Sequence, residues 1–426
     1  MPKIFGAALL ALALAAGSPT PAVATAPTQS DQIPGRYIVT LKDAAAPRSA
    51  KAAADAAVDA DAAVDAAVEK ASSLGAMVRH VYRHALHGYS ASMTRGAAAA
   101  LAEDPDVASV QPERWVRAAA QSTPTGVDRA EADLSPTAGI DGKDRRVNAD
   151  VAVIDTGVDL RHPDLNVFAQ GGKNCWFPQL SPQDMHGHGT HVAGIIGALD
   201  NDRGVVGMAP GARIWPVQVL SPLGWGSTAD VVCGIDYVTE HADQIDVANM
   251  SLGGDGADDG NCGNTDGDAM HQAICASVAA GVTYVVAAAN DHADAKDTAP
   301  ASYDEVITVS ALADFDGKPG GLARPTCRND QDDTFADFSN YGADVDLIAP
   351  GVCIRSTYFG GRYATLSGTS MASPHVAGGA ALYRATHPTA TPAQVKAALI
   401  AAGSSDWNAA GDGDATKEPL LKVSTF

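Results

Sequence analysis

The hydrophobic positions of residues 118–426 come in continuous runs rather than in strict alternation with polar ones. Such runs are DVAVID, RIWPVQVL, DVANMSL, VTYVVAAA, EVITVSAL and VDLIAPG. Strands that are apolar on both sides are typical of a parallel sheet whose two faces are covered. Helical stretches such as GTHVAGIIGAL and SMASPHVAGGAALYRATH lie between these runs. The pattern therefore predicts an α/β fold, a three-layer sandwich with a mostly parallel sheet.

Residues 33–117 show a different order of elements. Strand-like runs occur at GRYIVTLKD, AMVRHVYRHALHGYSASMT and ASVQPERWV, and helical stretches occur at Ala44–Ala71 and RGAAAALAEDPDV. The middle run is long enough for two strands, which gives the order β-α-β-β-α-β. This order predicts a small α+β domain of ferredoxin-like topology. The small, polar segment RAAAQSTPTGVDRA reads as a linker to the larger domain.

The first residues have the pattern of an export signal. Lys3 precedes an apolar run from Ile4 to Ala16, and small residues in A-x-A spacing follow. This predicts a secretory signal peptide over residues 1–26. The run is too short to cross a bilayer, and no later segment qualifies. We therefore expect a secreted protein without a membrane partner.

Composition narrows the partners further. The formal net charge of −21 and the pI of about 4.7 argue against nucleic acid, because phosphate binding needs a basic surface. The acidity is interpreted as a source of solubility. A mean hydropathy of −0.04 with 46% hydrophobic residues is typical of a soluble chain with a real core, which we expect to be a monomer.

The six cysteines are an even number in a chain that is predicted to be exported, so three disulfides are expected. Six cysteines allow 15 pairings, and the sequence does not choose among them. Positions in loops favour Cys262–Cys275 and Cys327–Cys353. Cys175 and Cys233 are then left for each other. The absence of C-x-x-C spacing argues against a zinc site built from cysteines.

Two short motifs carry candidate acid–base residues. Asp155 ends the buried strand VAVID, at the edge where ligand sites of open α/β sheets lie, although an isolated Asp there could also cap a turn. His188 stands between glycines in HGHGTHVAG, near a helix start. His186 and His191 lie beside it, but the zinc motif H-E-x-x-H is not formed. An imidazole acting as a base is the preferred interpretation.

The segment SGTSMASPHVAG offers three serines. Pro374 is tolerated in the first turn of a helix, so the helix is expected to begin near Ser370. A serine there can be a simple N-cap. The small neighbours of Ser370, however, leave its hydroxyl open, and its own N–H at the helix end would stabilise an oxyanion. Ser367 and Ser373 lack that combination.

A serine hydroxyl needs a base, and the base needs a third group to orient it. Asp155, His188 and Ser370 supply these groups in the chain order of subtilisins. The motifs VIDTGVD, HGHGTHVAG, NMSLGG and GTSMASPHVAG appear in sequence order. On these motifs the chain resembles the subtilisin-like serine proteases, most closely their proteinase-K-like secreted branch, from about Pro124 to about His387.

The resemblance implies the roles of the catalytic residues. Asp155 orients His188, which serves as general base and then general acid, and Ser370 attacks the scissile carbonyl. The side chain of Asn290 shares the oxyanion hole with the Ser370 N–H, and no cofactor is needed for catalysis. The family usually has Gly before this Asn, whereas this chain has Ala289, which leaves the primary specificity open.

The resemblance also implies where substrate binds. A polypeptide substrate would add as an extra strand between two edges. The residues expected to line these edges are Gly224 and Gly226 on one side and Ser251, Leu252 and Gly253 on the other.

Two segments suggest cations. The Asp/Gly-rich residues 255–268 do not match the EF-hand pattern and are interpreted as a surface loop closed by a disulfide. The resemblance implies a structural calcium ion elsewhere, held by backbone carbonyls near Asp304 and Val306 and by the carboxylate of Asp346.

The domain at residues 33–117 resembles the family's propeptide. It is expected to assist folding, to inhibit the protease and to be removed by a cut between about Arg117 and Ser122. Two other functions remain to be weighed. A secreted esterase would have G-x-S-x-G, but Ala372 replaces the second Gly. An inactive, protease-like binding protein would lack one of the four catalytic residues, and all four are present.

Overall fold

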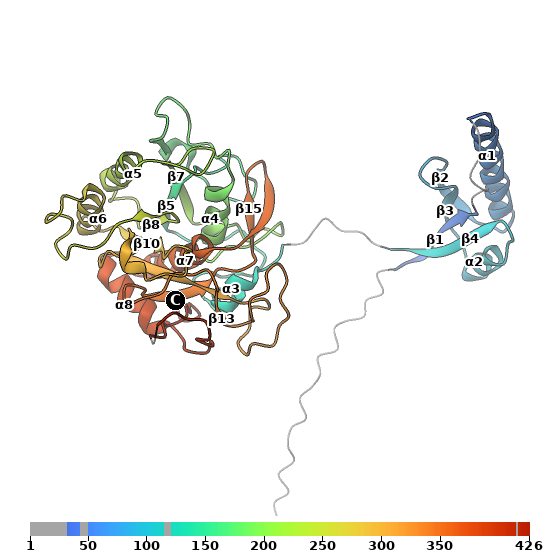
Figure 1. The fold of residues 1–426 in the computed structure, drawn as a ribbon. Coiled ribbons are helices and arrows are strands. Elements are labelled where there is room, and N and C mark those ends of the chain that lie inside the picture. Colours follow the sequence, from blue (N-terminus) through green and yellow to red (C-terminus); the bar gives the residue numbers. More distant parts are fainter. Residues whose placement is uncertain (1–31, 43–49, 115–120, 415) are drawn as a thin grey trace, which may run out of the picture. The chain divides into compact units, whose positions relative to one another are not determined.

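The computed structural model describes residues 32–42, 50–114, 121–414 and 416–426, which form two compact units split at Ala118 and Ala119 (Figure 1). The predicted signal peptide, residues 1–26, and most of the predicted cleavage region lie outside the described residues. Among the helices of the described residues, none is both long and apolar enough to cross a membrane.

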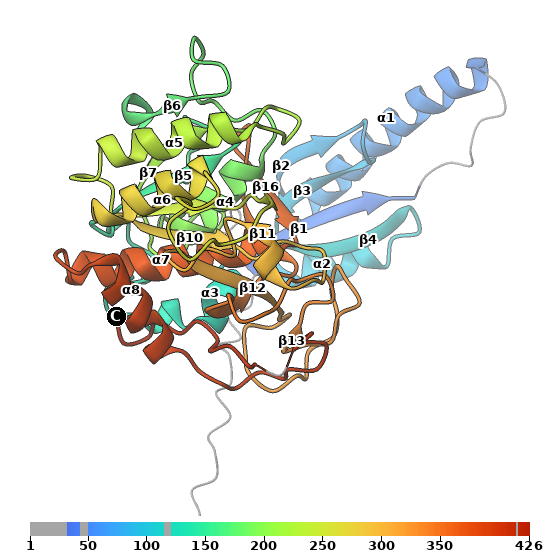
Figure 2. The same cartoon turned by 60° about the vertical axis from the view of Figure 1, so that its left-hand side comes forward.

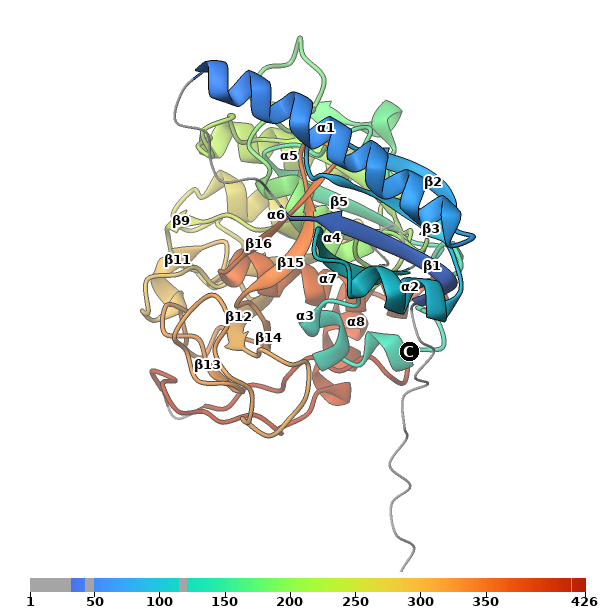
Figure 3. The same ribbon diagram turned by 90° about the vertical axis from the view of Figure 1, so that its right-hand side faces the viewer.

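The first unit is a four-stranded antiparallel sheet with two helices packed on it (Figure 3). Its elements are β1 (Gln32–Leu41), α1 (Ala50–Ser73), β2 (Met77–Tyr82), β3 (Gly88–Ser92), α2 (Arg95–Ala102) and β4 (Val107–Arg114). The strand order β2-β3-β1-β4 confirms the ferredoxin-like topology. Val39, Val64, Tyr89 and Leu101 are buried in its core.

The second unit is built on an eight-stranded sheet (Figure 2). Its strands are β5 (Asp150–Asp155), β6 (Lys173–Asn174), β7 (Arg213–Gln218), β8 (Val247–Met250), β10 (Thr283–Ala287), β12 (Ile307–Ala313), β13 (Thr334–Phe335) and β14 (Leu347–Pro350). The order is β13-β12-β10-β8-β5-β7-β6, with β14 also paired to β12. Only β13 pairs in the antiparallel sense within this sheet. The predicted mostly parallel sheet is confirmed.

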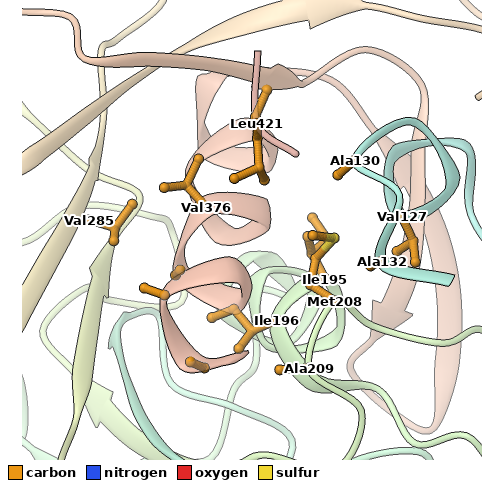
Figure 4. Packing of buried hydrophobic residues seen from close by; sticks show 14 of the residues in the cluster. Val127, Ala130, Ala132, Ile195, Ile196, Met208, Ala209, Val285, Val376 and Leu421 are labelled. Carbon is orange, nitrogen blue, oxygen red and sulfur yellow. The ribbon is translucent and has the colours of Figure 1, made fainter. Parts of the chain in front are cut away.

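Helices cover both faces of this sheet. They are α3 (Thr125–Arg129), α4 (His188–Gly197), α5 (Thr228–Glu240), α6 (Ala269–Ala279), α7 (Thr369–Thr386) and α8 (Pro392–Ala402). Val151 and Val153 of β5 pack with α4, α7 and α8 in one core, part of which Figure 4 shows. Ala152 and Ile154 point to the opposite core, which α5 and α6 cover. The continuous apolar runs thus follow from burial on both sides.

The carboxyl ends of β5, β8 and β10 meet at one edge of the sheet because these strands are parallel. The segments that follow them begin at Thr156, Ser251 and Ala288. Two antiparallel pairs complete the unit. β15 (Ile354–Tyr358) and β16 (Arg362–Leu366) form a hairpin, and β9 (Gly254–Asp255) pairs with β11 (Thr298–Ala299), which lies far along the chain. The candidate residues lie at the edge of the sheet where the carboxyl ends of β5, β8 and β10 meet.

Three disulfides join loops and helices of the second unit. They are Cys175–Cys233, Cys262–Cys275 and Cys327–Cys353, with Cα atoms 5.8 to 6.0 Å apart. The pairing favoured by the loop positions is therefore confirmed.

Candidate active site

Asp155 and His188 form a direct contact at the edge of the sheet. Asp155 is the last residue of β5 and is fully buried, while His188 is the first residue of α4. Nδ1 of His188 lies 2.8 Å from Oδ1 and 3.0 Å from Oδ2 of Asp155. The N–H of Thr156 also donates to this carboxylate, at 2.7 Å. The imidazole is thus held with Nε2 left for other contacts.

The approach of α4 to β5 depends on Gly189. A Cβ at this position would lie 2.1 Å from the carbonyl oxygen of Gly157 and 3.1 Å from Cβ of Asp155. Real side chains do not tolerate the first contact, so any larger residue would push α4 away from the strand. The glycine in the HGHGTH motif therefore sets the distance between His188 and Asp155.

Asp184 organises the turn that leads into α4. Its carboxylate accepts the backbone N–H groups of His186, Gly187 and Thr190 at 2.8 to 3.0 Å, and the hydroxyl of Thr156 at 3.0 Å. The sequence reasoning missed this residue. An Asp shortly before a helix start is a known capping signal and would have pointed to it.

The charge of Asp155 changes the acidity of His188. Burial opposes charging of the imidazole, but the neighbouring carboxylate outweighs it, so the pKa of His188 lies above its usual value. His191 behaves differently. It is fully buried, its Nε2 faces the carbonyls of Ile354 and Ala364, and burial lowers its pKa to about 3. The Nε2 contacts of His191 thus tie α4 to β15 and β16.

Ser370 lies at the second position of α7, after the N-cap Gly368. With His188 and Asn290 it lines a cleft of about 240 Å³. Its hydroxyl donates to the carbonyl of Ser251 at 3.3 Å. The hydroxyl is therefore hydrogen-bonded to the loop after β8, and among the described residues it makes no hydrogen bond to His188.

The other two serines of the motif have structural partners. Oγ of Ser367 accepts the N–H of Cys353 at 2.9 Å. Ser373 is fully buried, and its Oγ lies 2.9 Å from Oγ of Ser251. Of the three, Ser370 alone combines an accessible hydroxyl with the helix N-terminus.

The position of Pro374 differs from the prediction. It is the sixth residue of α7 and not part of the first turn. Because proline has no N–H, the carbonyl of Ser370 loses its helical partner. Oγ of Ser251 donates to this carbonyl instead, at 3.0 Å. The proline thus creates a tie between the start of α7 and the end of β8.

Asn290 and Ser370 present two N–H donors to the same place. Oδ1 of Asn290 accepts the N–H of Thr369 at 2.8 Å and its hydroxyl at 3.1 Å, which leaves the Nδ2 amino group unbonded among the described residues. A Cβ built on Gly368 would lie 3.7 Å from the Ser370 nitrogen and 3.9 Å from Nδ2 of Asn290. The absent side chain of Gly368 keeps this place open.

The five predicted substrate residues line one larger cleft of about 510 Å³. They are Gly224, Gly226, Ser251, Leu252 and Gly253. The need for glycine at position 226 has an internal reason, because a Cβ there would lie 2.3 Å from the carbonyl of Val219. Trp225 between the glycines is 79% exposed at the rim of this cleft.

The residues near Asp346 do not fit the calcium ion that the resemblance implied. The ammonium group of Lys396, on α8, lies 2.9 Å from Oδ1 of Asp346. The same nitrogen donates to the carbonyls of Val306 at 2.8 Å and Asp304 at 3.2 Å. All three expected ligands thus face a positive charge that is part of the chain. The prediction that Asp346 is a metal ligand is therefore corrected, because the Lys396 ammonium occupies the place that was expected for the ion.

Ala289 adopts a conformation that favours glycine. Its φ angle is +81°, in the left-handed region where a Cβ meets the following carbonyl. The departure from the family's usual Gly therefore introduces backbone strain directly before Asn290.

We expect Ala289→Gly to stabilise the protein by about 1 kcal/mol, because relief of strain outweighs the added freedom of the unfolded chain. Urea unfolding of the Ser370→Ala protein, with and without the change, measures it. Ala288→Gly is the matched control. Ala288 is buried and has no positive φ, so this change should destabilise the protein instead. Equal effects of the two substitutions would contradict the strain argument.

Removal of the Lys396 ammonium should create calcium dependence. Lys396→Ala leaves the Asp346 carboxylate and two carbonyls without a cation, so we expect a lower Tm in chelator and partial recovery in Ca²⁺. Saturation at 100 times Kd corresponds to about 2.7 kcal/mol. Lys417→Ala is the control, because that ammonium binds the carbonyls of Ser405 and Trp407 and, among the described residues, no carboxylate. A Ca²⁺ response no larger in Lys396→Ala than in Lys417→Ala would contradict the idea that the Lys396 ammonium takes the place of a calcium ion.

Known families and relatives match both units of the chain. The model of the subtilase family matches residues 148–416, and that of peptidase inhibitor I9 matches residues 36–119. The extracellular serine proteinase of Thermus sp. (strain Rt41A) is 37% identical over 383 residues, which cover 87% of this chain and 85% of that protein. Subtilisin E of Bacillus subtilis (strain 168) is 36% identical over 329 residues, covering 76% and 77%.

Solved structures agree with these matches. The crystal structure of a cold adapted subtilisin-like serine proteinase has a TM-score of 0.54 at 32% identity, and the match covers 70% of this chain and 97% of that one. The family predicted from the motifs is confirmed. The chain therefore belongs to the subtilase family and is a serine-type endopeptidase that carries an I9 inhibitor domain ahead of its protease domain.

Proposed function

We propose that Asp155, His188 and Ser370 are the catalytic triad of this endopeptidase and that Asn290 completes its oxyanion hole. The observation that carries the proposal is the contact of the buried Asp155 with His188, which lines a cleft together with Ser370 and Asn290. A family can retain its fold without activity, so the arrangement of these groups is the stronger argument. It supports proteolysis over a role in binding alone.

The proposed reaction uses side chains and one backbone N–H of the chain. On substrate binding the hydroxyl of Ser370 turns from the Ser251 carbonyl toward Nε2 of His188, which takes its proton as Oγ attacks the scissile carbonyl carbon. The negative oxygen of the tetrahedral intermediate accepts hydrogen bonds from Nδ2 of Asn290 and the N–H of Ser370. His188 then gives its proton to the leaving amine, and water cleaves the acyl-enzyme by the reverse path.

The substrate is proposed to be an extended polypeptide. The glycine-containing edge at Gly224 and Gly226 and the edge from Ser251 to Gly253 line the same cleft and offer backbone for strand addition. Leu252 contributes an apolar side chain to this cleft. We expect broad selection of apolar side chains, and Ala289, which replaces the family's usual Gly, leaves the finer preference open.

The full chain is proposed to be a secreted zymogen. Residues 1–26 act as the signal peptide, residues 33–117 as the inhibitory propeptide, and residues 118–426 as the protease domain, with the cut between about Arg117 and Ser122. The inhibitor-type match and the extracellular relative support this organisation. The protease domain is expected to work as a monomer, without nucleic acid or membrane as partner.

The test of the triad compares Ser370→Ala, Asn290→Ala and the control Ser405→Ala. Ser370→Ala should remove casein digestion by about 10⁶-fold in kcat, take no fluorophosphonate label and leave the propeptide uncut. Asn290→Ala should lose about 10²–10³-fold in kcat, as is known for this donor in a subtilisin, with unchanged folding by circular dichroism. Ser405 is exposed, so its variant should keep full activity.

The position of the label separates the alternatives. Mass spectrometry should find the fluorophosphonate on Ser370 and not on Ser367 or Ser373. A labelled protein that leaves casein intact would indicate an esterase. A protein that is neither labelled nor active after propeptide removal would indicate a binding protein, and either result overturns the proposal.

The acidic limb of the pH profile should report His188. The base works only when unprotonated, and its pKa is raised by Asp155, so kcat/KM should fall as the pH drops through a value above 6.5. Asp155→Asn removes the raising charge, so this limb should move to lower pH while kcat drops by about 10⁴-fold. Asp266→Asn, which removes an exposed charge, should leave the limb in place; a limb that Asp155→Asn does not move would contradict the assignment.

A further inference from the structure

His271 is a buried histidine with one unsatisfied ring nitrogen. It lies in the first turn of α6 and is fully buried. Its Nε2 is 2.9 Å from Oε2 of Glu305, but its Nδ1 has no hydrogen-bond partner among the described residues. Nδ1 points at two carboxylates, 3.9 Å from Oδ1 of Asp258 and 3.7 Å from Oδ1 of Asp259. These distances are too long for hydrogen bonds.

A cation between these three groups would balance the two negative charges. When Nε2 donates its proton to Glu305, Nδ1 carries a lone pair that faces two negative groups. The three donor atoms of Asp258, Asp259 and His271 all lie within 4.8 Å of one another. Two donors bound at about 2 Å to one ion lie roughly 3 to 4 Å apart, so the observed spacing leaves room for an ion between them.

The surroundings hold the imidazole in the orientation of a ligand. A metal-bound histidine usually donates its other N–H to a carboxylate, which is the contact with Glu305. The ring also stacks on Tyr303, with centroids 3.9 Å apart and planes 1° from parallel. The hydroxyl of Tyr303 in turn donates to Asp268, the N-cap of α6. His271 is thus fixed before any ion binds.

The two aspartates are fixed as well. Their oxygens accept backbone N–H groups of Gly260 and Asp304 (Asp258) and of Asn261, Gly263 and Thr265 (Asp259). The nearby Cys262 and Cys275 are not available as ligands because they form a disulfide. Side-chain exposure of Asp258 is 18%, so water can reach the site and complete the coordination.

We propose that Asp258, Asp259 and His271 bind one divalent transition-metal ion, of the class that zinc represents. Calcium binding is typical of subtilases, but calcium takes oxygen ligands, whereas an imidazole with two carboxylates suits zinc and its neighbours. The ion would join residues 255–268 to α6. Asp255 and Met270, next to the site, line the larger cleft, so the ion would also fix one wall of that cleft.

The test uses the full-length Ser370→Ala chain, freed of metal with a chelator and then titrated with Zn²⁺ by calorimetry. Zinc binding does not depend on whether Ser370 is the nucleophile. Co²⁺ absorption in the visible range provides a second readout of nitrogen and oxygen ligation. We expect one Zn²⁺ equivalent that is weakened by at least roughly 100-fold in Asp258→Asn and in His271→Gln, and by about 10- to 100-fold in Glu305→Gln.

Asp266→Asn is the matched control, since Asp266 is an exposed aspartate of the same loop outside the cluster. It should bind zinc like the parent. His271→Gln changes a buried residue and could prevent folding. In that case the zinc affinity of Asp258→Asn decides the test. The proposal is overturned if Asp258→Asn binds zinc as tightly as Asp266→Asn. It is equally overturned if the parent binds no zinc.

Discussion

The close approach of α4 to the end of β5 is the constraint on which the candidate active site depends. Gly189 allows it, because no Cβ stands between the helix and the carbonyl of Gly157. Asp184 then holds the turn before the helix, and His188 meets Asp155 without a flexible linker. The carboxylate and the imidazole are therefore positioned by the end of a strand and the start of a helix, both packed in the core.

The second half of the site is placed by a different device. Pro374 removes one hydrogen bond from α7, and the freed carbonyl of Ser370 is taken by Ser251 at the end of β8. Asn290 at the end of β10 is held in turn by Thr369 of the same helix. Two parallel strands and one helix start thus become a single rigid edge. The missing hydrogen bond at Pro374 thus allows the start of α7 to be joined to the end of β8.

Much of this was predictable because it depends on local sequence. Apolar runs predicted the buried strands, and Asp155 and Ser370 stood where a strand ended and a helix began. Lys396 was not predictable, because its contact with Asp346 is made by a helix far along the chain, and no local pattern joins them. The φ angle of Ala289 and the unpartnered Nδ1 of His271 were hidden for the same reason, since both result from tertiary packing.

The contact between Lys396 and Asp346 changes what the protein needs from its surroundings. Where an ion is recruited from solution, the local fold is complete only in a medium that supplies that ion. Here the positive charge is encoded in the polypeptide and arrives with α8 as the helix packs. Folding of this corner therefore does not depend on the mineral content of the surrounding medium.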